Sequence, residues 1–230
     1  MPSVSDNLRC VLDNIAVSAV RAGRNPSEVR LVAVTKNVDV ARICSAVSAG
    51  VDHLGENRVQ EAARKIPQVP GVPTWHLVGH LQRNKARHAV ELFSMIQSLD
   101  SLELAAELDR RCAARGVSLD VLLQVNVSGE STKYGVEPDA VAGVLREMPV
   151  FEHLQVRGLM TMAPYSEDPE DARVWFRALR GLARELSALR LSNVAMDELS
   201  MGMSGDYRVA VEEGSTIVRV GTAIFGERAH

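Results

Sequence analysis

Short apolar runs alternate with segments of helical periodicity along almost the whole chain. We expect each short run to form a strand, and each segment with apolar residues three and four positions apart to form a helix. Parallel strands need such crossover helices, so the alternation predicts a parallel sheet in an α/β protein. The expected strands are residues 31–35, 53–56, 75–79, 95–98, 121–127, 154–162, 199–203 and 217–225.

The number of these runs favours a closed (β/α)8 TIM barrel over an open doubly wound sheet. An extra N-terminal helix should precede the first strand and cover the bottom or side of the barrel, since Leu8, Leu12, Ile15 and Val20 fall roughly on one helical face. Little chain follows the eighth run, so residues 1–230 are predicted to form a single domain. Other expected helices include residues 41–49, 59–66, 102–115, 140–148 and 172–189.

The composition is that of an ordinary soluble globular protein, with 46% hydrophobic and 24% charged residues. The net charge of −3 indicates neither a nucleic-acid partner nor an anionic membrane. Cys10, Cys44 and Cys112 are widely scattered, which argues against a disulfide framework or a structural zinc and fits a reducing cytosol. Because no signal-peptide pattern or long apolar stretch is visible, we expect a cytoplasmic protein with no membrane partner.

Lysine usage narrows the candidate chemistry, because only four of the 26 lysine and arginine residues are lysines. Barrel active sites form at the C-terminal ends of the strands. Lys36 directly follows the first apolar run, so its amine is expected in the barrel mouth, where a lysine can form a Schiff base with a carbonyl ligand. A solvated surface lysine is the alternative. Lys133, in the loop after the fifth run, is the competing Schiff-base lysine.

Two further segments, 200–206 and 219–222, belong to the seventh and eighth runs, where barrels often bind phosphate. Residues 204–206 indicate the start of a short helix, and a helix start offers unpaired N–H groups to an anion. An ordinary serine cap with turn glycines is the alternative. The groups expected to reach a phosphate are those of Ser200, Ser204, Gly205, Gly221 and Thr222.

Arg219 stands out because it interrupts an apolar strand that should line a barrel. A buried charge there is costly unless it is paired or hydrogen-bonded. It could pair with a carboxylate such as Glu198 or Glu56, or its guanidinium could donate to the ring nitrogen of a ligand. No histidine or cysteine grouping has metal-ligand spacing, so no metal is expected.

Six segments together resemble the pyridoxal phosphate homeostasis protein family, in order from about residue 30 to 226. They are Thr35-Lys36, Gly55-Glu56-Asn57-Arg-Val-Gln-Glu61, and residues 75–85, 158–162, 199–206 and 219–226. The resemblance implies the fold of the alanine racemase N-terminal barrel (fold-type III), with pyridoxal 5′-phosphate held as a Schiff base on Lys36. It implies phosphate contacts from Ser200, Ser204, Gly221 and Thr222, with Asn57 and Met201 near the cofactor and Arg219 facing the pyridine nitrogen.

The same resemblance implies a cytosolic role in pyridoxal phosphate homeostasis or delivery to apo-enzymes, and in amino-acid and keto-acid balance, without an established reaction. A racemase needs acid/base groups on both faces of the reacting carbon. Tyr165 and Tyr207 could reach the mouth, yet neither forms a recognisable acid/base arrangement. An amino-acid racemase and a Schiff-base aldolase acting on a sugar phosphate stay as alternatives. We expect a monomer.

Overall fold

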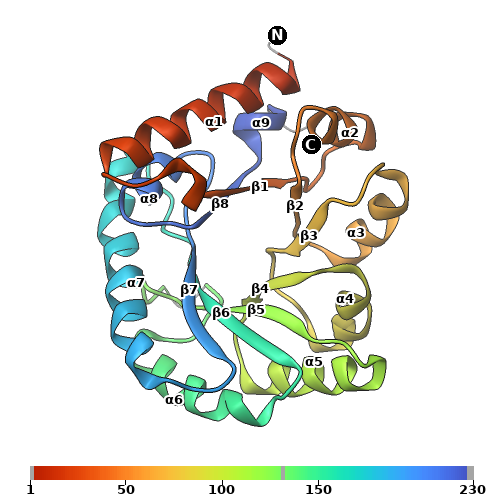
Figure 1. Ribbon diagram of the computed structural model, residues 1–230, viewed down its shortest axis with the longest axis vertical. Helices are drawn as coiled ribbons and strands as arrows, with labels where there is room; N and C mark the ends of the chain where they lie inside the picture. The colour runs from red at the N-terminus through yellow and green to blue at the C-terminus, as the bar shows by residue number, and fades with distance from the viewer. Residues whose placement is uncertain (1–2, 131–132, 227–230) are drawn as a thin grey trace.

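The computed structural model describes residues 3–130 and 133–226 and shows a closed barrel of parallel strands. Each strand pairs with its neighbour in chain order, and β8 closes the barrel on β1 (Figure 1). The eight strands are β1 Arg30–Val34, β2 His53–Glu56, β3 Thr74–Leu77, β4 Met95–Leu99, β5 Leu119–Gln124, β6 Leu154–Met160, β7 Val194–Ser200 and β8 Ile217–Val220. The predicted (β/α)8 barrel is confirmed.

Helices connect successive strands and surround the barrel (Figure 1). The helix α1 lies outside this alternation, because it precedes β1. The helices are α1 Val4–Arg21, α2 Val40–Ser48, α3 Val59–Lys65, α4 Ala86–Leu92, α5 Leu102–Arg115, α6 Pro138–Glu147, α7 Arg173–Leu186, α8 Tyr207–Glu212 and α9 Thr222–Phe225. Among the described residues, none of these helices has the length and apolar character needed to cross a membrane.

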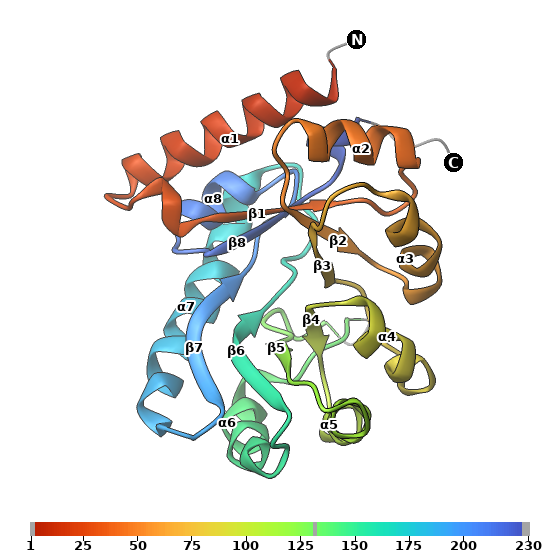
Figure 2. The same cartoon turned by 45° about the vertical axis from the view of Figure 1, so that its right-hand side comes forward.

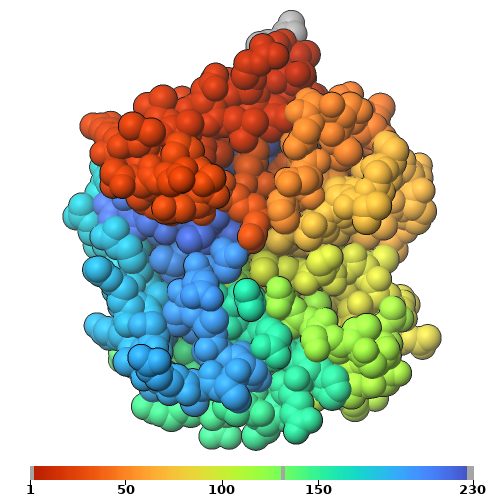
Figure 3. All heavy atoms as spheres, viewed as in Figure 1, coloured from red at the N-terminus to blue at the C-terminus, as the bar shows by residue number. Residues whose placement is uncertain are grey.

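The extra N-terminal helix packs along one side of the barrel, beside α8 and α9, in both ribbon views (Figure 2). In the space-filling view the red N-terminal segment lies over the blue C-terminal segment (Figure 3). The predicted face is partly wrong, since Leu12 is 46% exposed and Val20 is 66% exposed. The buried positions are Leu8, Val11, Ile15, Ser18 and Ala19.

Two strands differ most from the prediction, β7 at its start and β8 at its end. β7 begins at Val194, ahead of the predicted 199. The prediction started too late because the polar pair Asp197 and Glu198 interrupts the apolar pattern of the strand. The carboxylate of Glu198 is satisfied by the guanidinium of Arg30, at 3.1 Å. β8 ends at Val220, and the apolar residues that follow form α9 instead of continuing the strand. The short helix α9 therefore lies where extended backbone was expected.

The barrel interior contains an apolar layer from five different strands, formed by Val32, Met95, Leu122, Met160 and Ile217. Each of these side chains is at most 6% exposed. A separate, larger core lies between the strands and the helices. Polar side chains of β3, β4, β7 and β8 are also buried, and they connect the interior to the mouth of the barrel.

Candidate ligand-binding site

Seven of the nine sequence-predicted site residues line one cavity of about 330 Å³ at the barrel mouth. The cavity is bordered by segments that follow β1, β2, β7 and β8, as expected from the carboxyl ends of barrel strands. Its size is at the lower end of typical small-ligand sites, roughly 300–1,000 Å³. The predicted residues that line it are Lys36, Asn57, Ser204, Gly205, Arg219, Gly221 and Thr222, and it is completed by Val34, Val78, Met162 and Met203.

Ser200 and Met201 are the two predicted residues that do not line the cavity; each has no exposed surface. The competing Lys133 also lies elsewhere, where its amine pairs with Glu130 at 3.3 Å. Lys36 is therefore the one lysine among the described residues that reaches this cavity.

Thr35, which precedes Lys36, is fixed by a buried ion pair. Its hydroxyl donates to the Glu56 carboxylate at 2.7 Å, and its carbonyl accepts from the Lys65 amine at 2.6 Å. Lys65 also donates to Glu56 at 2.7 Å, and Glu56 is completely buried. Burial raises the pKa of Glu56, while the hydrogen bonds from Lys65 and Thr35 oppose that shift.

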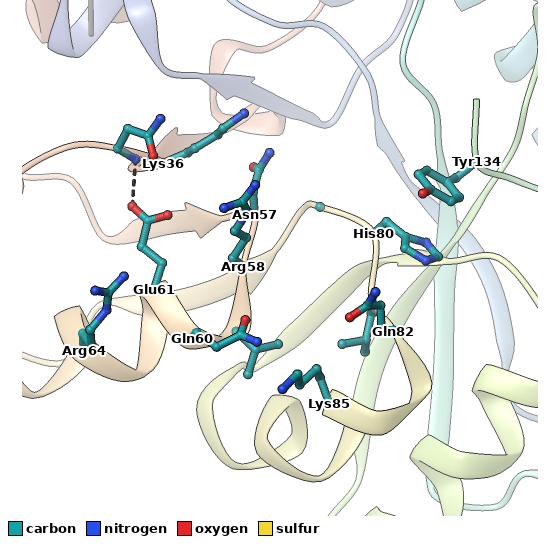
Figure 4. Close-up of a pocket in the computed structure, with 14 residues that line it drawn as sticks. Lys36, Asn57, Arg58, Gln60, Glu61, Arg64, His80, Gln82, Lys85 and Tyr134 are labelled. Atoms are coloured by element: carbon teal, nitrogen blue, oxygen red, sulfur yellow. Dashed lines mark hydrogen bonds between the residues drawn. The ribbon is translucent and has the colours of Figure 1, made fainter. Parts of the chain in front are cut away.

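The residue after Lys36 is tied to the same network. Glu61 accepts a hydrogen bond from the backbone N–H of Asn37 at 2.8 Å, which is dashed in Figure 4. It accepts another from Lys65 at 2.6 Å. Asn37 adopts a left-handed backbone, with φ of 57°. The backbone on both sides of Lys36 is therefore held by one buried amine, Lys65, although the resemblance did not implicate that residue.

The loop after β7 brings the hydroxyl of Ser204 to the start of α9. Its oxygen accepts from the backbone N–H groups of Gly221 and Ala223, both at 3.2 Å. With those lone pairs engaged, the hydroxyl proton is free to donate to an anion in the cavity. The loop needs glycine at Gly202, where φ is +94° and a Cβ would lie 2.5 Å from the Ala210 side chain.

The predicted helix start at residues 204–206 is only partly right. α8 begins at Tyr207, with Asp206 as its N-terminal cap residue. The Asp206 carboxylate accepts from the backbone N–H of Met203 at 2.5 Å and thereby closes the loop. Ser204 does not cap α8, because it bonds to the backbone at the start of α9.

Arg219 is 4% exposed and projects from β8 into the barrel. Its guanidinium donates to the Ser200 hydroxyl at 2.5 Å and to the Thr161 carbonyl at 2.7 Å. Burial lowers the pKa of Arg219 to about 10, and Asp206 opposes the shift. The side chain is therefore still a cation at neutral pH. A guanidinium has five N–H donors, so it retains donors for the cavity that it lines.

The carboxylate pairings considered for Arg219 are wrong for both named residues. Glu56 is occupied by Lys65 and Thr35. Glu198 bonds to Arg30 and, at 2.6 Å, to the hydroxyl of Thr216. The remaining expectation from the sequence, a guanidinium that donates to a ligand, is consistent with this geometry.

A chain of hydrogen bonds runs from Arg219 through the barrel interior. Ser200 accepts from Arg219 and donates to the Gln97 amide oxygen at 2.6 Å. The Gln97 amide nitrogen donates to His76 Nδ1 at 3.1 Å. His76 therefore carries its proton on Nε2, which donates to His53 Nδ1 at 3.0 Å. Every donor points away from Arg219, so the orientation of the arginine and the tautomer of His76 are linked.

This chain predicts a stability that depends on pH. Burial lowers the pKa of His76 to about 3, from an ordinary value of 6.5. Below about pH 6.5 the unfolded chain binds a proton that the folded protein does not, so the free energy of unfolding should fall as the pH falls. Between pH 7 and pH 5 the free energy of unfolding should fall by about 2 kcal/mol, which urea unfolding at the two pH values measures. In His76→Gln the free energy of unfolding should depend less steeply on pH. An equal dependence in both proteins would assign the effect to other groups.

Several polar residues noted in the sequence take other positions. The hydroxyl of Tyr207 accepts from Asn14 of α1 at 3.2 Å, and Tyr165 is 93% exposed. Neither lines the Lys36 cavity. His80 pairs with Asp100 at 3.0 Å and stacks on Tyr134, with ring centroids 3.8 Å apart. Tyr134 was not identified from the sequence, because nothing local marks a loop residue that stacks on a distant histidine.

Comparison with known proteins supports both the fold and the family. A family model described as alanine racemase, N-terminal domain, matches residues 7–229. A Pyridoxal phosphate homeostasis protein of Aquifex aeolicus (strain VF5) is 42% identical over 226 residues, 98% of each chain. Another protein of that name, from Escherichia coli (strain K12), is 39% identical over 236 residues, 99% of this chain and 98% of the relative.

Solved structures show the same architecture. PipY of Synechococcus elongatus PCC7942, solved with PLP bound, superposes with a TM-score of 0.80 at 40% identity, covering 94% of this chain and all 100% of PipY. An alanine racemase of Clostridium difficile 630 has a TM-score of 0.75 at 16% identity, and the match covers 98% of this chain and 58% of the racemase. At that identity the likeness concerns the fold alone.

The closed parallel barrel with its mouth cavity is thus a barrel of the alanine racemase N-terminal class. More narrowly, the chain belongs to the pyridoxal phosphate homeostasis protein family, as its near-full-length relatives establish.

Proposed function

We propose that this chain binds pyridoxal 5′-phosphate on Lys36 and acts in intracellular pyridoxal phosphate homeostasis. The observation that carries the proposal is the mouth cavity, which combines a lysine amine, hydroxyl and backbone donors, and a buried arginine. A carbonyl compound with an anionic group and a ring acceptor matches these three elements. The bound PLP in the structure of PipY, at 40% identity, supports the same ligand for this cavity.

The residues present fit the cofactor at each end. When bound, pyridoxal phosphate supplies an aldehyde that condenses with a lysine amine and a ring that withdraws electrons. Lys36 would hold the aldehyde end, with Asn57 beside it. Arg219 would donate to the ring nitrogen, and because its charge is retained it opposes protonation of that nitrogen. The phosphate would be held by Ser204, Gly205, Gly221 and Thr222.

Ser200 and Met201 receive different roles from the cavity residues. Ser200 contacts Arg219 instead of the cavity, so we assign it to orienting the guanidinium. The backbone of Met201 bonds to Ile217 of β8 and to the Ser215 hydroxyl, and it thereby fixes the loop that carries Ser204.

We further propose that the protein holds and delivers the cofactor without robust catalysis, as a single domain of residues 1–230. The tyrosines considered as acid/base groups, Tyr165 and Tyr207, lie away from the cavity, which favours this role over a racemase. The proposal includes transient apo-enzyme acceptors and a contribution to amino-acid and keto-acid balance. It also includes a monomeric state and a cytoplasmic location. The three cysteines, all free, are compatible with that compartment.

Borohydride trapping of the purified protein tests the proposal. The intact mass should show a reduced pyridoxyl phosphate adduct, and the modified peptide should contain Lys36. An adduct on Lys133 would show that the cofactor binds at that lysine and not at Lys36. Trapping of a sugar phosphate would favour the aldolase alternative, and rapid turnover of D- or L-amino acids would favour the racemase. A protein without any adduct after loading with the cofactor would refute cofactor binding on a lysine.

A further inference from the structure

A second and larger cavity, of about 740 Å³, adjoins Lys36 and Asn57 (Figure 4). It is formed by the segments that follow β2 and β3, by α3, and by the loop after β5. Figure 4 shows the stacked rings of His80 and Tyr134 on the side opposite Lys36. The proposed function does not use this space, since the residues assigned to phosphate line the smaller cavity.

The lining of the larger cavity is strongly basic. Arg58, Arg64 and Lys85 contribute three cations besides Lys36, and none of the three forms a salt bridge with another described residue. The cavity has one carboxylate, that of Glu61. It is already engaged by the Lys65 amine at 2.6 Å and by a backbone N–H at 2.8 Å. Arg64 is near enough to help lower the pKa of Glu61, but among the described residues no carboxylate of the lining forms a salt bridge with Arg58, Arg64 or Lys85.

Neutral donors accompany these cations. The amides of Asn57, Gln60 and Gln82 line the same space, and none of these side chains has a hydrogen-bond partner among the described residues. The His80 ring is held by Asp100 and therefore forms a fixed wall with Tyr134. Guanidinium groups bind carboxylate and phosphate oxygens through paired N–H donors, and amides add neutral hydrogen bonds.

We propose that this cavity is a second binding site, which takes a small organic dianion such as a dicarboxylate or a phosphate monoester. Three unpaired cations and three amides exceed what one carboxylate needs. Lys36 lines both cavities, so a dianion held here lies next to the amine that would carry the cofactor. That proximity to the cofactor rests on the proposed function, whereas the anion site itself does not.

Calorimetric titration of the cofactor-loaded protein tests this site with three probes: succinate, inorganic phosphate and propionate. Loading occupies the smaller cavity, so binding reports on the larger one. We expect succinate or phosphate to bind at least tenfold more tightly than propionate. Arg64→Gln, and separately Lys85→Gln, should weaken that binding at least tenfold. Arg83→Gln is the matched control, since Arg83 is exposed and lies outside the cavity.

The outcomes separate the possible ligands and the two proposals. Preference for succinate identifies a dicarboxylate site, and preference for phosphate identifies a phosphate-ester site. Equal affinities for all three probes, or equal losses in Arg64→Gln and Arg83→Gln, overturn the proposal. If the protein does not load with cofactor, succinate titration of the cofactor-free protein still tests the anion site, because Arg64 and Lys85 are independent of Lys36 chemistry.

Discussion

Lys36→Ala protein is expected to purify without covalently bound cofactor and to lack the absorbance of a lysine imine in the cavity, even after incubation with excess pyridoxal phosphate. Lys36 is the one lysine that reaches the smaller cavity among the described residues. Loss of its amine removes the covalent link but leaves the donors of Ser204 and Arg219 in place. Weak, reversible binding should therefore remain in the variant, detectable by dialysis equilibrium, while borohydride traps nothing.

Two controls accompany Lys36→Ala. Lys133→Ala should retain normal loading, because that amine pairs with Glu130 away from the cavity. The cofactor-free proteins should unfold in urea within about 0.5 kcal/mol of one another, since the Lys36 side chain has no hydrogen bond to a described residue. Normal covalent loading of Lys36→Ala would contradict the assignment of the Schiff base to Lys36. The lysine that borohydride then traps would be the site instead.

The barrel and most of the cavity were predictable because their signals are local. Alternating strands and helices are visible as periodicity. Lys36 follows a short apolar run, Gly221 lies within another, and the carboxyl ends of barrel strands meet at one mouth. β7 was predicted too short because the polar pair Asp197 and Glu198 interrupts its apolar pattern, with Asp197 exposed. Polarity within a strand was informative at Arg219 but misleading in the middle of β7.

Contacts between distant segments were not predictable. Ser200 lies in the same motif as Ser204, and both hydroxyls were expected to reach a phosphate. Ser200 instead points into the barrel, because it is the last residue of β7, and its hydroxyl bonds to Gln97 across the interior. Gln97 itself was visible only as a polar residue within the apolar run of β4. A polar side chain in such a run indicates an interior hydrogen bond, but sequence alone does not identify its partner.

The second large effect is expected at Lys65, which is 8% exposed and donates to three oxygens. Lys65→Met keeps the length of the side chain but leaves the Glu56 carboxylate completely buried without its cation. Removing one partner of a buried ion pair costs about 3–5 kcal/mol, so we expect a loss of that size in the free energy of unfolding. Urea unfolding at neutral pH measures it. The matched double variant Glu56→Leu/Lys65→Met should recover much of the loss, because the completely buried Glu56 charge is removed together with its partner.

The pH dependence distinguishes an uncompensated charge from simple loss of packing. Glu56 already has a pKa raised by burial above its ordinary 4.5, and without Lys65 the pKa should rise further. A raised carboxyl pKa favours the folded state at low pH and loses that advantage as the pH rises through it. The deficit of Lys65→Met relative to the unmodified protein should therefore shrink as the pH falls toward 4.5. The deficit of the double variant should change less with pH, because Glu61 is then the one carboxylate of this network that has lost Lys65.

Lys65 also holds the backbone on both sides of Lys36, through the Thr35 carbonyl and through Glu61. Folded Lys65→Met protein should consequently bind pyridoxal phosphate more weakly, with a slower approach to full absorbance, although Lys36 is intact. The double variant should regain stability without regaining affinity, because neither substitution restores a donor to the Thr35 carbonyl. Recovery of both properties together would mean that Lys65 stabilises the barrel without positioning Lys36.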